Sequence, residues 1–451
     1  MRNLLKPIAF PVALSVFAAA CLWAPADAGA QRLSFIRDAE IENTIRTYAT
    51  PLFQAAGLEP SDVRIYLISD RSLNAFVAGG QRLFINTGLI MRSKHAGQVI
   101  GVIAHETGHI AGGHLSRLHA AIANSTAQSI LALVIGAAAA IGTGRGDVGA
   151  AIVAGGQSMG LRSFLHYNRT QESAADQAAL RFLDATGQSS RGLLEFMELL
   201  GAQDLLSADR QDPYLRTHPL SRERVDAVQA HLSRSPNRDK AQPARIQELH
   251  RRMLAKLYAF LEPVPRTLRR YADSDTGLAA RYARAIAYYR KPDLGKALPL
   301  IDGLIAERPE DPYFHELKGQ MLFENGRAAE AMKPYETAVR LMPRSPLLRR
   351  GLAQVQLELG DPALLEPAIR NLRAALQQDA DAPFTWRQLA IAYGRQGNMG
   401  MSAVALAEEA LLKGHARQAR YHAGKAEKLL PHGSMGWLQA QDILQAAKKK
   451  E

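Results

Sequence analysis

The stretch Val102-Ile103-Ala104-His105-Glu106-Thr107-Gly108-His109-Ile110 decides how the rest of the chain is interpreted. Its apolar run passes into helical periodicity, so a helix is expected, and His105 and His109 then project from one face at a spacing that a single zinc ion can bridge. Glu106 lies beside the pair and suits a general base that takes a proton from a zinc-bound water. Because an H-E-x-x-H string arises by chance in roughly one chain in a hundred of this size, it needs support from elsewhere in the sequence.

The first thirty residues indicate export. They have the layout of a cleaved secretory signal, with basic residues, an apolar run and then small residues, in the order Arg2 and Lys6, Ile8 to Trp23, and Ala26 to Ala30. A membrane anchor is the less favoured alternative, because the apolar run is short and Pro11 interrupts it. The sequence therefore predicts a signal peptide over residues 1–30.

The only cysteine, Cys21, lies inside that signal. It follows three alanines, as a lipidated acceptor cysteine would, but the apolar residues after it favour cleavage further on, which leaves the exported chain without thiol or disulfide chemistry. The formal net charge of +12 suits an anionic membrane surface or acidic clients, with an ordinary solvated surface as the alternative. Because the chain is exported, no nucleic-acid partner is expected.

Short strands are expected just upstream of the motif. A strand over 63–68 is followed by two more on either side of Gly79-Gly80, which is typical of a hairpin. The first strand of the hairpin contains Asn74, Ala75 and Phe76. These residues can form an edge that pairs with an extended substrate backbone, although an ordinary structural hairpin fits the pattern equally well.

Downstream of the motif, residues 130–154 are strongly apolar. Two runs, Ile130 to Ile141 and Val148 to Ala154, are separated by a glycine-rich piece, and neither reaches the roughly twenty residues that span a bilayer. A buried helix and a mobile hydrophobic hairpin are both open. We favour a hairpin near the active-site cleft, with peripheral membrane contact as one possible role.

The second half of the chain indicates helical repeats. Of the 451 residues, 233–275 are interpreted as a solvated linker and a connecting helix. Beyond it, small residues, glycines and prolines recur 34 positions apart, and then 37 apart after a three-residue insertion: Ala297 and Ala331, Pro309 and Pro343, Pro312 and Pro346, Gly319 and Ala353, Gly326 and Gly360, then Pro383, Ala390 and Gly397. This spacing resembles tetratricopeptide repeats. Residues 276–451 are therefore expected to form an α-solenoid whose concave face holds peptides or partner proteins, or else a purely structural extension.

Two histidines leave a zinc ion short of a third protein ligand. The metzincin pattern requires a histidine at position 115, but that residue is Leu115, and His114 comes one residue early, about 100° away around a helix. A better candidate is Glu172-Ser173-Ala174-Ala175-Asp176, where the two carboxylates share a helix face. Glu172 can complete the shell while Asp176 bonds the outer nitrogen of a ligating histidine. A solvated helix face is the alternative, which the apolar neighbours disfavour.

Three motifs occurring in order carry a family resemblance. They are His105-Glu106-Thr107-Gly108-His109 with His114, then Glu172 to Asp176, then Thr217-His218-Pro219 with Arg224. Together they resemble the gluzincin metallopeptidases that include the CAAX prenyl endopeptidase. With an export signal ahead and repeats behind, the chain is similar to the periplasmic subgroup of β-barrel assembly-enhancing proteases.

The resemblance implies one zinc ion per chain, held by His105, His109 and Glu172, with Glu106 as general base and Asp176 as an assisting acid. It also implies that His218 can become a fourth, regulatory ligand, and that Arg224 can stabilise the oxyanion of the tetrahedral intermediate. His114 and His166 are interpreted as structural histidines. Some members of the subgroup have cysteines that tie the repeats to the peptidase, and their lack here argues against regulation by disulfide exchange.

The expected protein is mainly α-helical. A zincin-type peptidase domain with a small β-sheet or hairpin occupies 31–232, and the solenoid follows the linker. The resemblance implies a periplasmic zinc endopeptidase and chaperone, associated with the outer membrane, that acts on outer-membrane β-barrel proteins and their assembly machinery. One alternative is a non-proteolytic repeat scaffold or chaperone with a latent zinc site. Another, a membrane-embedded prenyl-type peptidase, would need spanning helices that the sequence does not convincingly supply.

Overall fold

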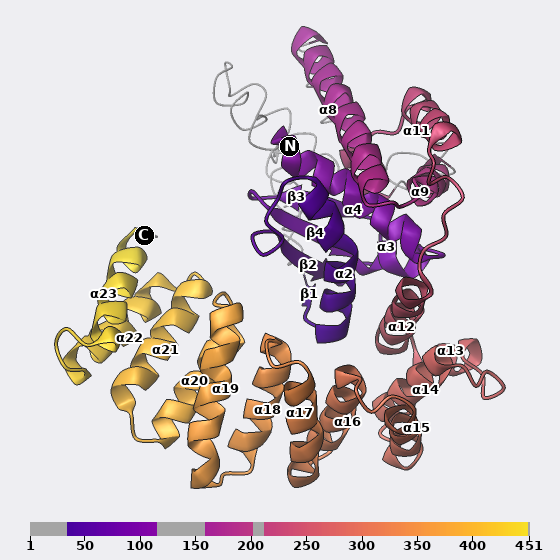
Figure 1. Cartoon of the computed structure of the whole chain (residues 1–451). Helices are drawn as coiled ribbons and strands as arrows, with labels where there is room; N and C mark the ends of the chain where they lie inside the picture. The colour runs from indigo at the N-terminus through magenta and orange to yellow at the C-terminus, as the bar shows by residue number, and fades with distance from the viewer. Residues whose placement is uncertain (1–33, 115–157, 202–211, 450–451) are drawn as a thin grey trace, which may run out of the picture.

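The computed structural model describes residues 34–114, 158–201 and 212–449. The predicted signal over 1–30, Cys21 and the apolar segment 130–154 lie outside the described residues, and so does the side chain of His166. The fold class is confirmed: the described chain is predominantly helical, with one small sheet and a long row of helix pairs (Figure 1).

The described strands form one sheet with the order β1-β2-β4-β3. Its strands are β1 (Phe35–Ile36), β2 (Arg64–Ile68), β3 (Ala75–Ala78) and β4 (Arg82–Asn86). β2 runs parallel to β4, whereas β1 and β3 are antiparallel to their neighbours. The predicted hairpin is β3–β4, and it turns at Gly79 and Gly80, whose φ angles of 54° and 91° favour glycine. Within the described residues, β3 is therefore an edge strand.

Helices pack around this sheet and supply the core. They are α2 (Ala39–Ala55), α3 (Thr87–Arg92), α4 (Ala96–Ala111), α8 (Ser158–Ala185), α9 (Arg191–Gly201), α10 (Pro213–Thr217) and α11 (Arg222–Arg234). α4 is the central element, and glycines let its neighbours approach closely. A Cβ on Gly101 would lie 2.7 Å from the Leu193 nitrogen in α9, and one on Gly108 would lie 2.6 Å from the Ala175 oxygen in α8. The second contact brings α8 against the H-E-x-x-H turn.

The second half of the chain is a solenoid of antiparallel helix pairs, as the spacing predicts. After α12 (Ala244–Leu261) and α13 (Val264–Arg270) come α14 (Leu278–Arg290), α15 (Leu294–Glu307), α16 (Pro312–Glu324), α17 (Ala328–Leu341), α18 (Pro346–Glu358), the 3₁₀ turn η1 (Pro362–Leu364), α19 (Leu365–Gln378), α20 (Pro383–Arg395), α21 (Met399–Leu412), α22 (Ala416–Leu429) and α23 (Met435–Lys448). Proline begins α16, α18 and α20, where its missing N–H costs nothing. The domain boundaries at residues 232 and 275 stay a prediction.

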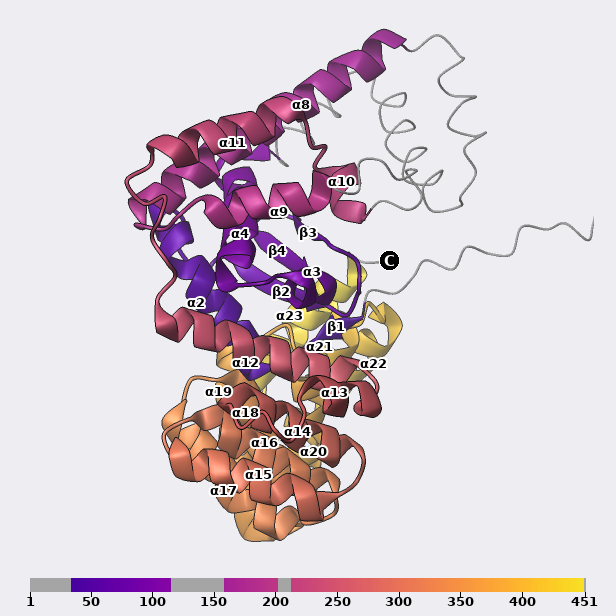
Figure 2. The ribbon, with the colours of Figure 1, turned by 90° about the vertical axis from the view of Figure 1, so that its right-hand side faces the viewer.

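Helix α12 lies between the solenoid and the part of the chain that contains the sheet, as a turned view shows (Figure 2). Buried charges join them. Glu40 of α2 is 1% exposed and receives Arg252 Nη2 at 2.7 Å and the Tyr282 hydroxyl at 2.7 Å, while Lys256 Nζ lies 3.3 Å away. No helix among the described residues combines the length and apolar character that crossing a bilayer requires.

Candidate metal centre

Helix α4 positions the two histidines of the motif. His105 and His109 lie one turn apart and are 1% and 7% exposed, and their Nε2 atoms are 3.1 Å apart. Two buried imidazole nitrogens on one helix face do not normally lie this close together without a proton or a cation between them. The arrangement therefore indicates a binding site and not a packing contact.

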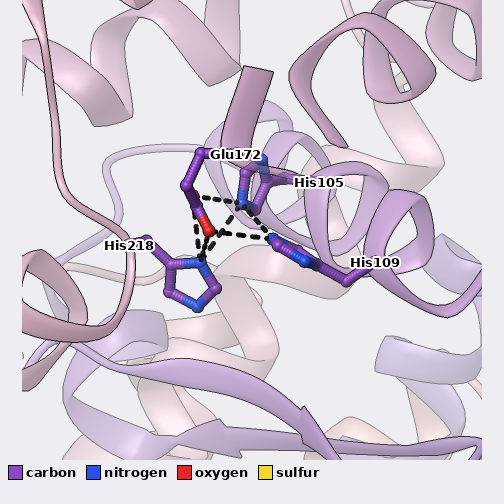
Figure 3. Close-up of side chains that lie close together, drawn as sticks. All are labelled: His105, His109, Glu172 and His218. Carbon is purple, nitrogen blue, oxygen red and sulfur yellow. Dashed lines mark hydrogen bonds and ion pairs between the residues drawn. The ribbon is translucent and has the colours of Figure 1, made fainter. Parts of the chain in front are cut away.

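Two later segments complete a set of four donors (Figure 3). Glu172 of α8 places Oε2 3.3 Å from His105 Nε2 and Oε1 3.3 Å from His109 Nε2. His218, which ends α10, places Nδ1 3.1 Å from Glu172 Oε1 and 3.4 Å from His105 Nε2. Donors about 2.0–2.1 Å from a zinc ion at the corners of a tetrahedron lie roughly 3.3–3.4 Å apart. The four side chains therefore fit a tetrahedral metal ion.

The electrostatics of the donor set favour a cation. Burial lowers the pKa of His105, but hydrogen bonds with Asp176 and Glu172 outweigh it and raise the pKa to about 10. Burial alone would raise the pKa of Glu172, yet the surrounding histidines hold it well below its usual range. The carboxylates thus stabilise positive charge at His105, whereas burial lowers the pKa of His109 to about 3, so that this ring is held as a neutral donor.

Glu106 lies next to the donors but outside them. Its side chain is fully buried, and Oε2 has no hydrogen-bond partner among the described residues. The Tyr214 hydroxyl donates to Oε1 at 3.4 Å, and His218 Nε2 lies 3.5 Å from the same oxygen. Burial raises the pKa of Glu106 above its ordinary value. A buried carboxylate with one uncommitted oxygen is suited to accepting a proton.

Asp176 and Arg224 form a layer behind the donors. Asp176 Oδ1 lies 2.8 Å from His105 Nδ1, and Arg224 donates to both of its oxygens at 2.6 and 2.9 Å. Arg224 Nη1 also donates to the Pro219 carbonyl at 2.6 Å and lies 3.1 Å from Glu172 Oε2. The Arg224 guanidinium therefore connects α8 to the loop that contains His218 through hydrogen bonds. Stabilisation of an oxyanion by Arg224 stays a prediction.

Two contacts were not foreseen from the sequence. His114 is buried, and its Nδ1 lies 3.0 Å from His109 Nδ1, so it contacts the outer face of the second motif histidine. Tyr214 stacks on His218, with ring centroids 4.5 Å apart and planes at 28°. The contact of His114 could have been predicted, because His114 is part of the sequence motif. No residue near Tyr214 in the sequence indicates its contact with His218.

The predicted substrate edge, Asn74 to Phe76, lies at the start of β3. The Asn74 carbonyl accepts the Asn86 N–H across the β3–β4 pair, so Asn74 and Phe76 turn their backbone groups towards β4. Ala75, between them, turns its N–H and C=O away from β4, but the residue is completely buried. Pairing of a substrate strand with Ala75 therefore stays a prediction.

This combination of a helix carrying H-E-x-x-H, a carboxylate from a later helix and a buried base defines a metallopeptidase domain, which here is joined to a helical solenoid. Residues 36–232 match the sequence model of peptidase family M48. The part of the chain that carries the four donors is therefore similar to peptidase family M48, and the protein is a metalloprotease.

Curated relatives extend the similarity into the repeats. The chain is 25% identical over 423 residues to the beta-barrel assembly-enhancing protease of Escherichia coli strain K12, covering 89% of this chain and 81% of that protein. A Vibrio cholerae protein named for the same activity is 24% identical over 285 residues, covering 62% of this chain and 58% of its own length, so the match spans little more than half of that relative. The metalloprotease YcaL of Escherichia coli strain K12 is 27% identical and covers 39% of this chain and 63% of its own.

Among solved structures, the tetratricopeptide-repeat protein YrrB is 17% identical, with a TM-score of 0.32, covering 43% of this chain and 97% of its own.

Proposed function

We propose that the protein is an exported zinc endopeptidase that hydrolyses peptide bonds in outer-membrane β-barrel proteins whose assembly stalls. The observation that carries the proposal is the convergence of His105, His109 and Glu172 within reach of one ion, with Glu106 buried beside them. The client class is supported by the names of the relatives, which describe enhancement of barrel assembly in those proteins.

The residues divide the chemistry among them. His105, His109 and Glu172 would hold zinc, which when bound supplies a Lewis acid that polarises the scissile carbonyl and makes water more acidic. Glu106 takes the proton of the attacking water and delivers it to the departing amine, so that no net proton is gained or lost. Asp176 fixes the orientation of the His105 ring through Nδ1.

His218 makes the site latent. Its Nδ1 lies with the three ligands, and its Nε2 lies beside Glu106, so it fills the position that substrate and water need. A four-ligand shell is typical of structural zinc, whereas a catalytic site keeps one position open. Removal of His218 should therefore raise proteolysis.

The test compares wild-type protein with Glu106→Gln and His218→Ala variants, by zinc content and by cleavage of casein. Glu106→Gln should keep one zinc per chain and lose cleavage by at least 100-fold, because the base contributes roughly that much or more. His218→Ala should cleave faster than wild type. Cleavage retained in Glu106→Gln would remove the proposed base.

A second function, client binding by a repeat scaffold or chaperone, is supported by the closed donor set and the solenoid. In that case neither the wild type nor His218→Ala would cleave casein, while unfolded clients would still bind. The predicted membrane contact through residues 130–154 stays a prediction, because these residues lie outside those that the structure describes.

A further inference from the structure

Pairing with β4 continues upstream of β3, because the Asn74 carbonyl accepts the Asn86 N–H. Since Asn74 turns its backbone groups towards β4, alternation turns those of Leu73 the opposite way, to the same side as Ala75. Both residues are completely buried, so an extended substrate that used Leu73 and Ala75 as alternate pairing positions would first have to displace what covers them.

The chain itself already occupies the Leu73 position. The Asp212 carboxylate accepts the Leu73 N–H at 2.9 Å, and the Tyr214 N–H donates to the Leu73 carbonyl at 3.3 Å. Leu73 is completely buried, and Asp212 is held in place by Arg92, whose Nη1 donates to Oδ2 at 2.8 Å. Residues 212–214 thus make the pair of contacts that the backbone of an added strand would make.

The same segment leads directly to the metal centre. Tyr214 begins the single turn that the His218 N–H closes by donating to the Tyr214 carbonyl at 2.7 Å. The Tyr214 ring stacks on the His218 ring, and its hydroxyl reaches Glu106. A displacement of Tyr214 from Leu73 must therefore disturb the position of His218.

We propose that Asp212 is a positioning residue that couples the substrate edge to the metal centre. A substrate strand that extends along β3 to Leu73 displaces Asp212 and the Tyr214 N–H, and α10 then carries His218 away from the donor set. A tripeptide is too short to pair along β3 as far as Leu73 and leaves the contact intact. The site thereby selects long extended segments, such as those of an unfolded polypeptide. This inference rests on the proposed latency of His218.

The first test measures cleavage of unfolded casein by zinc-loaded, full-length variants. Asp212→Ala should cleave several-fold faster than wild type, and Arg92→Gln should do so more weakly, because it removes the Arg92 contact and leaves the Leu73 contact with Asp212 in place. The double variant Asp212→Ala/His218→Ala should be no faster than His218→Ala, since both changes open the same restraint. Asp239→Ala, which alters an exposed ion pair far from the site, is the matched control and should leave the rate unchanged.

The second test measures the displacement of residues 212–218 and does not depend on cleavage. In Glu106→Gln protein, amide hydrogen exchange across residues 212–218 should increase when reduced, carboxymethylated casein is added, and it should stay at its basal level with a tripeptide. If exchange there does not change with casein, or if Asp212→Ala leaves cleavage at the wild-type rate while His218→Ala accelerates it, the coupling is wrong and the latency stands. If His218→Ala does not accelerate cleavage, the proposed function itself fails.

Discussion

Contacts to the outer ring nitrogens decide how the two motif histidines are held. His105 Nδ1 contacts the Asp176 carboxylate, and His109 Nδ1 contacts His114. Such partners fix the ring orientation and the tautomer that presents Nε2 to a metal, and their loss typically lowers metal affinity 10–100-fold. The two histidines are thus oriented by different chemistry, one by a charged group and one by a second imidazole.

Asp176→Asn should lower zinc affinity by about 10–100-fold, because the amide keeps the shape but loses the charge that favours His105 as a ligand. Competition with a chromophoric chelator measures the affinity directly. Asp226→Asn, at an exposed position on α11, is the control and should bind zinc like wild type. Equal affinity of the two variants would remove Asp176 from the metal centre.

His114→Ala should weaken zinc binding by about 10-fold, since His109 loses its outer contact. Gly112→Ala should have a similar effect, because its Cβ would lie 2.4 Å from His114 Nε2 and displace that ring. His114→Asn, whose amide can still reach His109, should recover part of the affinity. The same chelator competition serves here, and full affinity in both His114→Ala and Gly112→Ala would contradict this role.

At the scale of elements, the contact between α4 and α8 brings the carboxylate to the histidines. Gly108 lies in the motif turn, directly against Ala175 of α8. Gly108→Ala should force the helices apart, lose bound zinc and destabilise the fold by about 1–3 kcal/mol, as overpacking does. Gly303→Ala, inside α15 with open space around it, should instead stabilise by about 0.5–1 kcal/mol. Metal analysis and urea unfolding separate the two outcomes, and zinc retained in Gly108→Ala would argue against the contact.

Spacing within one helix could be read from the sequence, and the need for a third ligand pointed to Glu172, whereas the contacts of Tyr214 and Asp212 could not be predicted. Residues four apart share a face, so the pairs His105/His109 and Glu172/Asp176 were predictable as units. The Tyr214 hydroxyl and Glu106 are separated by 108 positions, and neither residue has a neighbour that indicates the other. The Asp212–Leu73 contact depends on strand alternation and on where α10 starts, which are both set by tertiary packing.

At the scale of the whole molecule, buried charges fix the peptidase domain on the solenoid. Glu40 lies between Arg252 and Lys256 and is bonded by Tyr282, 242 positions away. Burial raises the pKa of Glu40, but those cations outweigh it and hold the pKa below the usual range. The pair of domains therefore depends on a carboxylate that stays ionised without access to water.

Glu40→Ala should destabilise the protein by about 3–5 kcal/mol, because it leaves two buried cations without their partner. Glu42→Ala, which breaks a partly exposed pair with Arg37, should cost less than about 1 kcal/mol. Urea unfolding of both variants provides the comparison. Similar losses in the two would mean that the buried network does not hold the domains together.

Glu316 should make this junction sensitive to pH. Burial raises its pKa to about 7, although Lys256 Nζ, 3.9 Å away, opposes the shift. A carboxyl whose folded pKa is raised contributes stability below its unfolded pKa of about 4.5, and that contribution is lost as the pH rises through 7. Between pH 5 and pH 8, Glu316→Gln should therefore lose less thermal stability than wild type. Parallel curves for the two proteins would refute the assignment.

The central claim is that His105, His109 and Glu172 hold one metal ion in this fold, and elemental analysis with cleavage assays on the same His218→Ala sample tests it most directly. The account predicts one zinc per chain, loss of casein cleavage on chelation and recovery with one equivalent of zinc. Protein that contains no transition metal, and whose activity is indifferent to chelation, would contradict it.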